Sequence, residues 1–388
     1  MNKQVANVQL MQKMNRLKVL SFVRRNPDVA RPQIAHSTGL SLASITNITS
    51  YLLDLGLLAE CGTEKVGRVG RKSTLLRFCA KNYDLICVYL DEKYMNIAYT
   101  DLEGKAIEKI KVETEGLTPD DIIDELRQNL KSLIKKHDKS RILGIGIAIS
   151  GLVLDDSRFI FSSRLKWKSQ DVKSALEKET DIPVFVNNVS FLKAVWYFAK
   201  KQFDTPDNML YIDLENGIGA VQYADGSIFR KTLGEIGHTT VEPDGEPCFC
   251  GNRGCLEAMC SPKRLLSLYE ESSNKCASLR EIDKLYKKED THAVSAVSSC
   301  GMYLGIGLAN LVNLFNPSVM VINSGDFEDC PSILIEAERV LRERAYPSLT
   351  QKLSIKHINE TEENTIFGTA FDLCDRLFDV SFSGNIVE

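Results

Sequence analysis

The chain has 388 residues, of which 44% are hydrophobic and 26% are charged, so it is long enough to bury the cores of two or three domains. No apolar run approaches the roughly 20 residues that span a bilayer, and the polar start of the chain lacks the apolar core of a signal peptide. The 11 cysteines are irregularly spaced, which favours a reducing compartment over a disulfide framework, so we expect a cytoplasmic protein.

The net charge of -4 hides a division along the chain. Residues 1–78 contain 12 Lys and Arg against 4 Asp and Glu, whereas the remaining residues contain 36 against 48. A basic first segment on an acidic body suggests that only the first segment meets a polyanion such as DNA. A basic surface that is merely solvated is the alternative on charge alone.

The first segment is predicted to form three short helices. Apolar residues recur at helical spacing over 15–25, and a second helix over 31–40 has proline in its first turn and glycine at its end. Ser41 can cap a third helix that runs to about Leu55. This arrangement is typical of a helix-turn-helix, whose third helix enters the major groove, although a small helical scaffold would show the same pattern. The polar residues of the third helix that we predict to contact DNA are Ser44, Thr46 and Asn47.

A basic, glycine-rich loop is expected next, between two strands. The segment 62–72 contains the first strand and the loop, and residues 73–78 form the second strand. Arginines on such a loop can enter a narrow minor groove, where the phosphates concentrate negative potential. The pattern predicts a winged helix-turn-helix over residues 1–80. The loop residues predicted to contact DNA are Arg68, Arg71 and Lys72.

From about residue 81 the chain alternates between strand and helix patterns. The run 142–149 is apolar almost without interruption, as expected for a strand buried on both faces of a sheet. This alternation predicts an α/β architecture. The expected strands are residues 83–90, 95–100, 142–149, 184–186 and 319–323, and the expected helices are residues 119–137, the segment after 190, and 304–316.

A group of metal-binding residue types lies in the middle of the chain. Three cysteines, Cys248, Cys250 and Cys255, follow His238 in Cys-x-Cys-x4-Cys spacing. Zinc binds four nitrogen or sulfur ligands in a tetrahedron, and these four leave no position for water, so the predicted site is structural. Glycines between the second and third cysteines let the backbone turn tightly around one ion. A set of buried, unbridged cysteines is the alternative.

The spacing of this segment closely resembles that of the ROK family, which includes sugar-responsive bacterial repressors and sugar kinases. The resemblance rests on the lead-in Gly234-Glu235-Ile236-Gly237-His238 and the exit Gly254-Cys255-Leu256-Glu257, and it runs from about Asn15 to about Arg376. It implies a two-lobed body of the actin and hexokinase type, which is ribonuclease H-like, after the DNA-binding domain. The implied body is 81–388, with a first lobe of about 81–200 plus a C-terminal helix of about 369–388, and a second lobe of about 201–368.

The resemblance also implies a sugar site in the cleft between the lobes. Carboxylates in the family positions of Glu235 and Glu257 accept paired hydrogen bonds from sugar hydroxyls, although either could instead cap a helix or orient a neighbour. His238 can bind zinc through one ring nitrogen and serve the ligand through the other. The implied sugar-binding residues are Gly151, Asn187, Asn188, Glu235, His238 and Glu257.

The chain departs from the family's kinases at three places. A glycine-rich phosphate turn is replaced by residues 90–94, which contain no glycine, and Ser324-Gly325 stands in place of a Gly-Gly pair. Asn188 occupies the position of the catalytic aspartate, and an amide cannot take the proton whose transfer contributes about 10²- to 10⁴-fold to a rate. The alternative is that Asn187 and Asn188 merely shape a loop.

We therefore expect a transcriptional repressor of sugar-utilisation genes that contains structural zinc. It is expected to bind operator DNA as a homodimer or homotetramer and to respond to a sugar or sugar derivative. Two alternatives remain on the sequence alone. One is an ATP-dependent sugar kinase with a DNA-binding head, and the other is a repressor controlled by a protein partner.

Overall fold

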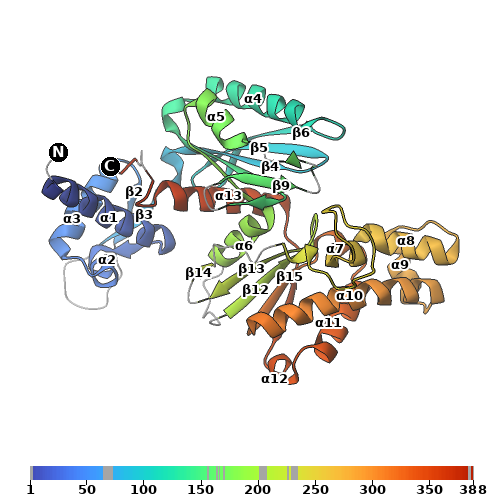
Figure 1. Ribbon diagram of the computed structural model, residues 1–388. Coiled ribbons are helices and arrows are strands. Elements are labelled where there is room, and N and C mark those ends of the chain that lie inside the picture. Colours follow the sequence, from blue (N-terminus) through green and yellow to red (C-terminus); the bar gives the residue numbers. More distant parts are fainter. Residues whose placement is uncertain are drawn as a thin grey trace.

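The computed structural model describes residues 3–63, 73–154, 157–162, 165, 167–168, 171–200, 208–224, 227–228, 235–382 and 386–387. These residues form a small N-terminal domain beside a body of two lobes, each built on a five-stranded sheet (Figure 1). The predicted DNA-contacting residues Arg68, Arg71 and Lys72 lie outside the described residues, as does Gly234 of the family lead-in.

The N-terminal domain combines three helices with a small antiparallel sheet of order β1-β3-β2. Its elements are α1 (Lys3–Arg25), β1 (Val29–Ala30), α2 (Arg31–Thr38), α3 (Leu42–Asp54), β2 (Leu58–Thr63) and β3 (Thr74–Phe78). Gly39 has a φ of 70°, a left-handed conformation that ends α2 and turns the chain into α3. Ser41 caps α3 by accepting a hydrogen bond from the backbone of Ser44.

Two boundaries in this domain differ from the prediction. Helix α1 begins at Lys3 and not near residue 15. The prediction missed this start because residues 8–12, which include Met11, are exposed and so show no buried apolar stripe. Strand β2 begins at Leu58, before the predicted segment. Only Leu58 of that strand is buried, so it shows no alternation that could mark its start.

The first lobe contains a sheet of order β11-β7-β4-β5-β6. Three strands form an antiparallel meander, and β7 and β11 then run parallel to β4. The strands are β4 (Asp84–Leu90), β5 (Tyr94–Asp101), β6 (Ala106–Glu113), β7 (Ile142–Ile149) and β11 (Val184–Asn188), with α4 (Pro119–Lys136) and α5 (Val172–Thr180) on one face (Figure 1). A small sheet of β8 (Leu152–Val153), β9 (Phe159–Ser162) and β10 (Trp167–Lys168) lies after β7.

The second lobe repeats the same strand connectivity. Its sheet has the order β14-β13-β12-β15-β16, again a meander followed by two strands parallel to its first strand. The strands are β12 (Asn208–Asp213), β13 (Gly219–Ala224), β14 (Ser227–Ile228), β15 (Val319–Asn323) and β16 (Ser354–Ile358). The sequence shows no internal repeat, so this duplication is visible only in the topology.

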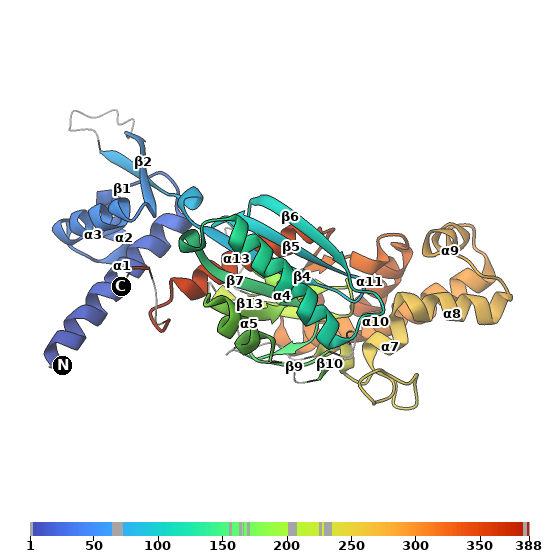
Figure 2. The same ribbon diagram turned by 90° about the horizontal axis from the view of Figure 1, so that it is seen from above.

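Helices gather at the far end of the second lobe (Figure 2). They are α7 (Leu256–Cys260), α8 (Pro262–Ser273), α9 (Leu279–Tyr286), α10 (Thr291–Phe315), α11 (Ser332–Arg344) and α12 (Pro347–Thr350). Among the described residues, α10 alone has the length and composition of a membrane span, but much of it is buried in this lobe. At Gly305 a Cβ would lie 2.6 Å from the Ala337 carbonyl, so the close packing of α10 on α11 requires glycine there.

Two helices lie between the lobes, α6 (Val189–Lys200) and α13 (Glu362–Leu377). They pack on each other so closely that a Cβ at Gly368 would lie 2.0 Å from the Leu192 carbonyl oxygen. Helix α13 also packs on β4 and β7, so the last helix returns to the first lobe. Its start at Glu362 precedes the expected residue 369.

Candidate ligand cleft and metal centre

A cleft of about 530 Å³, including its open mouth, lies where the two lobes meet. Its walls come from the ends of β7 and β11, the start of α6, the loop between β12 and β13, the short helix Ile236–His238 and α7. The described lining residues are Ser150, Gly151, Ser162, Asn188, Val189, Ser190, Glu215, Asn216, Gly217, Ile218, Gly219, Glu235, His238 and Glu257. Five of the six predicted sugar-binding residues are therefore together.

Asn188 both lines the cleft and holds its wall. Its Nδ2 donates to the Gly151 carbonyl at 2.8 Å, and its Oδ1 accepts from the backbone N–H of Ser190 at 2.8 Å at the start of α6. Gly151 has a φ of 134°, and a Cβ there would lie 2.4 Å from the Phe161 carbonyl. The amide of Asn188 thus shapes the loops around the cleft and leaves one N–H for a ligand.

Asn187 is not brought to the cleft, contrary to its predicted place in the sugar site. Neighbouring residues of a strand face opposite sides of the sheet, so Asn187 of β11 faces α13 while Asn188 faces the cleft. Its Nδ2 donates to Asp372 at 3.2 Å, and Asp372 also accepts from Arg376 at 2.8 Å. Asn187 therefore links the strand that ends at the cleft to the last helix.

Glu235, His238 and Glu257 line the other part of the cleft. Burial raises the pKa of Glu235, as expected for a carboxylate removed from water before a ligand arrives. A Cβ at Gly217 would lie 3.3 Å from Glu257 Oε2, and one at Gly237 would lie 3.2 Å from it. Glycine at both positions leaves the Glu257 carboxylate room in the cleft wall.

His238, Cys248, Cys250 and Cys255 form a group that can hold a metal ion, with their ligand atoms all within 4.8 Å of one another. Cys248 Sγ lies 3.4 Å from His238 Nδ1, and Cys250 Sγ lies 3.7 Å from Cys255 Sγ. A tetrahedron with bonds of about 2.0–2.3 Å places its ligand atoms roughly 3.3–3.8 Å apart, so these separations fit such an ion. The backbone turns back at Gly254, where a Cβ would lie 1.5 Å from the Glu242 carbonyl.

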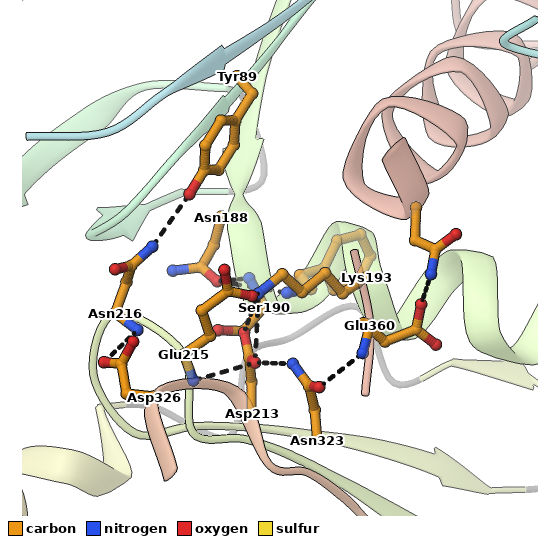
Figure 3. Close-up of polar contacts among 12 residues, drawn as sticks. Tyr89, Asn188, Ser190, Lys193, Asp213, Glu215, Asn216, Asn323, Asp326 and Glu360 are labelled. Carbon is orange, nitrogen blue, oxygen red and sulfur yellow. Dashed lines mark hydrogen bonds and ion pairs between the residues drawn. The ribbon is translucent and has the colours of Figure 1, made fainter. Parts of the chain in front are cut away.

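Sequence reasoning missed a buried ion cluster behind the cleft. Lys193 of α6 is 1% exposed and pairs with Asp213, which is 0% exposed, at 3.3 Å, and with Glu215 (Figure 3). Asp213 also accepts from Asn323 at 2.7 Å, and Asn323 accepts from the backbone of Glu360 at 2.9 Å. Burial lowers the pKa of Lys193, but the charges of Asp213 and Glu215 outweigh it and the net shift is upward. The available signal was that Lys193 is flanked on both sides by apolar residues of α6.

Residues of the two lobes also meet directly at the cleft. Asn216 donates from Nδ2 to the hydroxyl of Tyr89 in β4 at 3.0 Å (Figure 3). Its backbone N–H donates to Asp326 at 3.0 Å, and its φ is 60°. The turn at residues 90–94, where the resemblance led us to expect a replaced phosphate turn, is a β-hairpin between β4 and β5, in which the Asp91 N–H donates to the Tyr94 carbonyl at 3.0 Å.

The described DNA-contact candidates lie on α3. Thr46 and Asn47 are exposed and Ser44 is partly exposed, whereas Ile45 and Leu52 are buried against the rest of the domain. Thr46 Oγ1 donates to the Leu42 carbonyl at 2.9 Å, so its hydroxyl oxygen remains an acceptor. The polar face of α3 is thus open to a partner.

The fold is a body of two lobes with a cleft between them, joined to a small N-terminal domain of three helices and a three-stranded sheet. A model of the ROK family matches residues 85–374. The chain belongs to the ROK family, and the predicted fold class is confirmed.

Related proteins extend over nearly the whole chain. The xylose repressor of Bacillus subtilis strain 168 is 28% identical over 353 residues, 89% of this chain and 91% of that protein. The transcriptional dual regulator NagC of Escherichia coli K12 is 28% identical over 391 residues, 96% of this chain and 95% of that protein.

The chain is similar in structure to a solved regulator and to a solved kinase. A ROK family transcriptional regulator, a homologue of the Escherichia coli MLC protein, has a TM-score of 0.80 and 25% identity, covering 94% of this chain and 96% of that one. A ROK glucokinase from Streptomyces griseus has a TM-score of 0.60 and 22% identity, covering 75% of this chain and 98% of the kinase. The kinase shows the fold of the body alone, whereas the regulator extends over more of the chain.

Proposed function

We propose that the protein is a DNA-binding transcriptional repressor of sugar-utilisation genes, whose cleft binds a sugar and thereby modulates DNA binding. The observation that carries this proposal is the relation to named sugar repressors over about nine-tenths of each chain. The cleft supports it, because an amide, two carboxylates and an imidazole meet there and can bond the hydroxyls of a polyol. We place this function in the cytoplasm.

We propose that Ser44, Thr46 and Asn47 contact the bases of the operator, and that Arg68, Arg71 and Lys72 contact the minor groove or its phosphates. The first three lie on the open face of α3, where a helix-turn-helix reads DNA. A homodimer or homotetramer would fix two copies of α3 about 34 Å apart, one turn of B-DNA. DNA release then requires a ligand with unequal affinity for two arrangements of these helices.

The route for such coupling runs through α13. Asn188 lines the cleft, and its neighbour Asn187 bonds to Asp372 of α13. About one turn further along α13, Asp375 pairs with Arg24 of α1. A change at the cleft that moves β11 would thus act on α13 and, through it, on the DNA-binding domain.

We propose that the metal ion is zinc and that its role is structural. The three thiols and one imidazole are typical zinc ligands, and together they fill a tetrahedral site. A metal held through His238 Nδ1 leaves the proton on Nε2, which fixes the imidazole as a hydrogen-bond donor toward the cleft. Metal binding then orders a wall of the sugar site.

We also propose that the protein is not a kinase. Asn188 cannot serve as a general base, and its carbonyl oxygen is already used to cap α6. A phosphate can approach a loop closely only where small residues leave the backbone N–H groups open. The loop after β12 instead carries the Glu215 carboxylate into the cleft.

The proposal is tested with the full chain by selecting genomic fragments that it binds, and then measuring fluorescence anisotropy on these fragments with and without sugars. A selected site whose Kd changes with one sugar supports the proposal. Brisk ATP-dependent phosphorylation of a sugar would instead favour the kinase, and DNA binding that no sugar alters would favour control by a protein partner.

A further inference from the structure

The described part of the cleft is acidic. Its lining includes the carboxylates of Glu215, Glu235 and Glu257, but no lysine or arginine among the residues that the structure describes. The imidazole of His238 faces the thiol of Cys248 through Nδ1. A divalent ion held by three thiolates keeps a net negative charge, so a metal at that group does not offset the carboxylates.

The one buried lysine nearby is already committed to the protein's own carboxylates. Lys193 pairs with Asp213 at 3.3 Å and with Glu215, so two carboxylates face one ammonium group (Figure 3). The side chain of Lys193 is 1% exposed and is not among the residues that line the cleft. Its charge is balanced internally and is not offered to a ligand.

Two backbone amides of the loop after β12 are also occupied. A phosphate site on a loop needs N–H groups that point toward the anion. In the loop after β12, the N–H of Glu215 donates to Asp213 at 3.4 Å, and the N–H of Asn216 donates to Asp326 at 3.0 Å. The protein's own carboxylates thus already accept the hydrogen bonds that these two N–H groups would otherwise donate to a phosphate.

The electrostatic environment of Glu215 agrees with this geometry. Burial raises its pKa most, and although Lys193 lowers it, the net shift is upward, with Asp213 and Asp326 adding to the rise. An environment that disfavours the single negative charge of a carboxylate disfavours the two negative charges of a phosphate ester more strongly.

We propose that the cleft selects an uncharged sugar and rejects the phosphate ester of the same sugar, and that Glu215 determines this selectivity. The proposal rests on the proposed sugar-sensing function. It goes further by assigning the chemical class of the effector, a free sugar before phosphorylation, and by giving Glu215 a role beyond its ion pair.

The test uses the full chain and matched pairs of probes: glucose with glucose 6-phosphate, and N-acetylglucosamine with its 6-phosphate, with xylose as an additional neutral sugar. Isothermal titration calorimetry at low and high salt gives the Kd of each. At least one neutral sugar is expected to bind, and its phosphate ester is expected to bind at least about tenfold more weakly. The ratio of the two Kd values should fall at high salt, because salt screens the carboxylates.

Glu215→Gln is the decisive variant. It removes one negative charge and leaves Lys193 paired with Asp213, so the buried ammonium group is not stranded. The variant should narrow the ratio between the Kd of the phosphate ester and the Kd of its parent sugar by roughly tenfold. Glu343→Gln, which removes an exposed carboxylate on α11, is the matched control and should leave this ratio unchanged.

Three results would overturn the inference. Binding of a phosphate ester by the wild-type protein as tightly as its parent sugar would contradict the selectivity while leaving sugar sensing intact. If a folded Glu215→Gln protein keeps the same ratio between the Kd of the phosphate ester and the Kd of its parent sugar, Glu215 does not determine the selectivity. If no member of any pair binds, sugar sensing itself fails, and the inference falls with it.

Discussion

The Arg24 side chain of α1 is held against α13 by the carboxylate of Asp375, and it also lies over the ring of Phe371 at 4.3 Å. Arg24 Nη1 donates to the Phe371 carbonyl at 3.4 Å. The pair joins the first helix of the DNA-binding domain to the last helix of the body, and the side chains of Arg24 and Asp375 are only 7% and 16% exposed. An ion pair this shielded from water transmits a displacement better than a surface pair, since solvent and salt screen it little.

We predict that Asp375→Asn separates sugar binding from DNA release. The Kd for sugar should stay within about twofold, whereas the change that the sugar causes in DNA affinity should shrink at least about threefold, because α1 loses its charged partner on α13. The free energy of unfolding should fall by about 2–4 kcal/mol, since Arg24 is left without that partner. Calorimetry, anisotropy and urea unfolding measure the three quantities.

Arg25→Ala is the matched control for this variant. Arg25 lies 3.5 Å from the same carboxylate, but it is 57% exposed, so its loss should cost less than about 1 kcal/mol. If the sugar still shifts DNA affinity fully in Asp375→Asn, the α1–α13 contact plays no part in coupling.

Asn188→Asp should not create a kinase. The new carboxylate would face the Gly151 carbonyl, which now accepts a hydrogen bond from Asn188 at 2.8 Å, and this contact becomes repulsive. We expect a loss of about 1–3 kcal/mol in the free energy of unfolding and no sugar phosphorylation above background. A coupled ADP assay and urea unfolding check these two expectations.

Asn313→Asp is the control for the amide-to-acid change, because Asn313 accepts a hydrogen bond from the Tyr346 N–H through Oδ1 and keeps it as aspartate. Its stability should be near that of the wild-type protein. Turnover of ATP by Asn188→Asp would contradict our account of the loop after β12.

Cys250→Ser should abolish stoichiometric metal binding. With three donors left, the group no longer completes a tetrahedron, so we expect purified protein to lose roughly one metal equivalent per chain and to show a lower Tm. Elemental analysis and thermal unfolding are the measurements. Cys276→Ser, an exposed cysteine outside the group, should retain full metal content, and full content in Cys250→Ser would refute the ligand assignment.

Arg68→Ala with Arg71→Ala should weaken binding to every DNA sequence by a similar factor. Each lost phosphate contact lowers the slope of log K against log salt by about 1, so the double variant should lower it by about 2. Anisotropy at several salt concentrations measures the slope. Arg280→Ala, on the second lobe, should leave it unchanged. An unaltered slope in the double variant would exclude phosphate contact by these arginines.

Asp28 should titrate well below the ordinary pKa of an aspartate. Hydrogen bonds from Arg77, and then from Cys61, lower the pKa of Asp28 to about 2 from its ordinary 3.8. Because the folded pKa is depressed, the Asp28–Arg77 contact contributes fully above about pH 4 and is lost as pH falls toward 2.

The ¹³C shift of the Asp28 carboxyl, followed against pH, measures this value. Arg77→Ala should move the pKa back toward 3.8, while Asp138, whose pKa is lowered by Ser140, should not change. An Asp28 pKa that ignores the loss of Arg77 would contradict the assigned cause.

Local patterns predicted much of the fold because the corresponding interactions are local. Ser41 caps α3 and Gly39 ends α2, both within a few residues, so a sequence window contains all the groups involved. The start of α1 was not predictable in this way, since residues 8–12 of the helix are exposed and present no buried stripe. The duplicated sheet topology was invisible because two unlike sequences satisfy the same hydrogen-bond order.

The sequence by itself determined that a basic helical domain precedes an α/β body, and that one histidine and three cysteines are spaced for a single ion. These features depend on residue type and short spacing. Only the tertiary structure decided that Asn187 faces α13 while Asn188 faces the cleft, and that Lys193 meets Asp213 and Glu215. Such contacts join residues from separate elements. Their energies depend on which side chains are buried together away from water, and local spacing along the chain does not specify this.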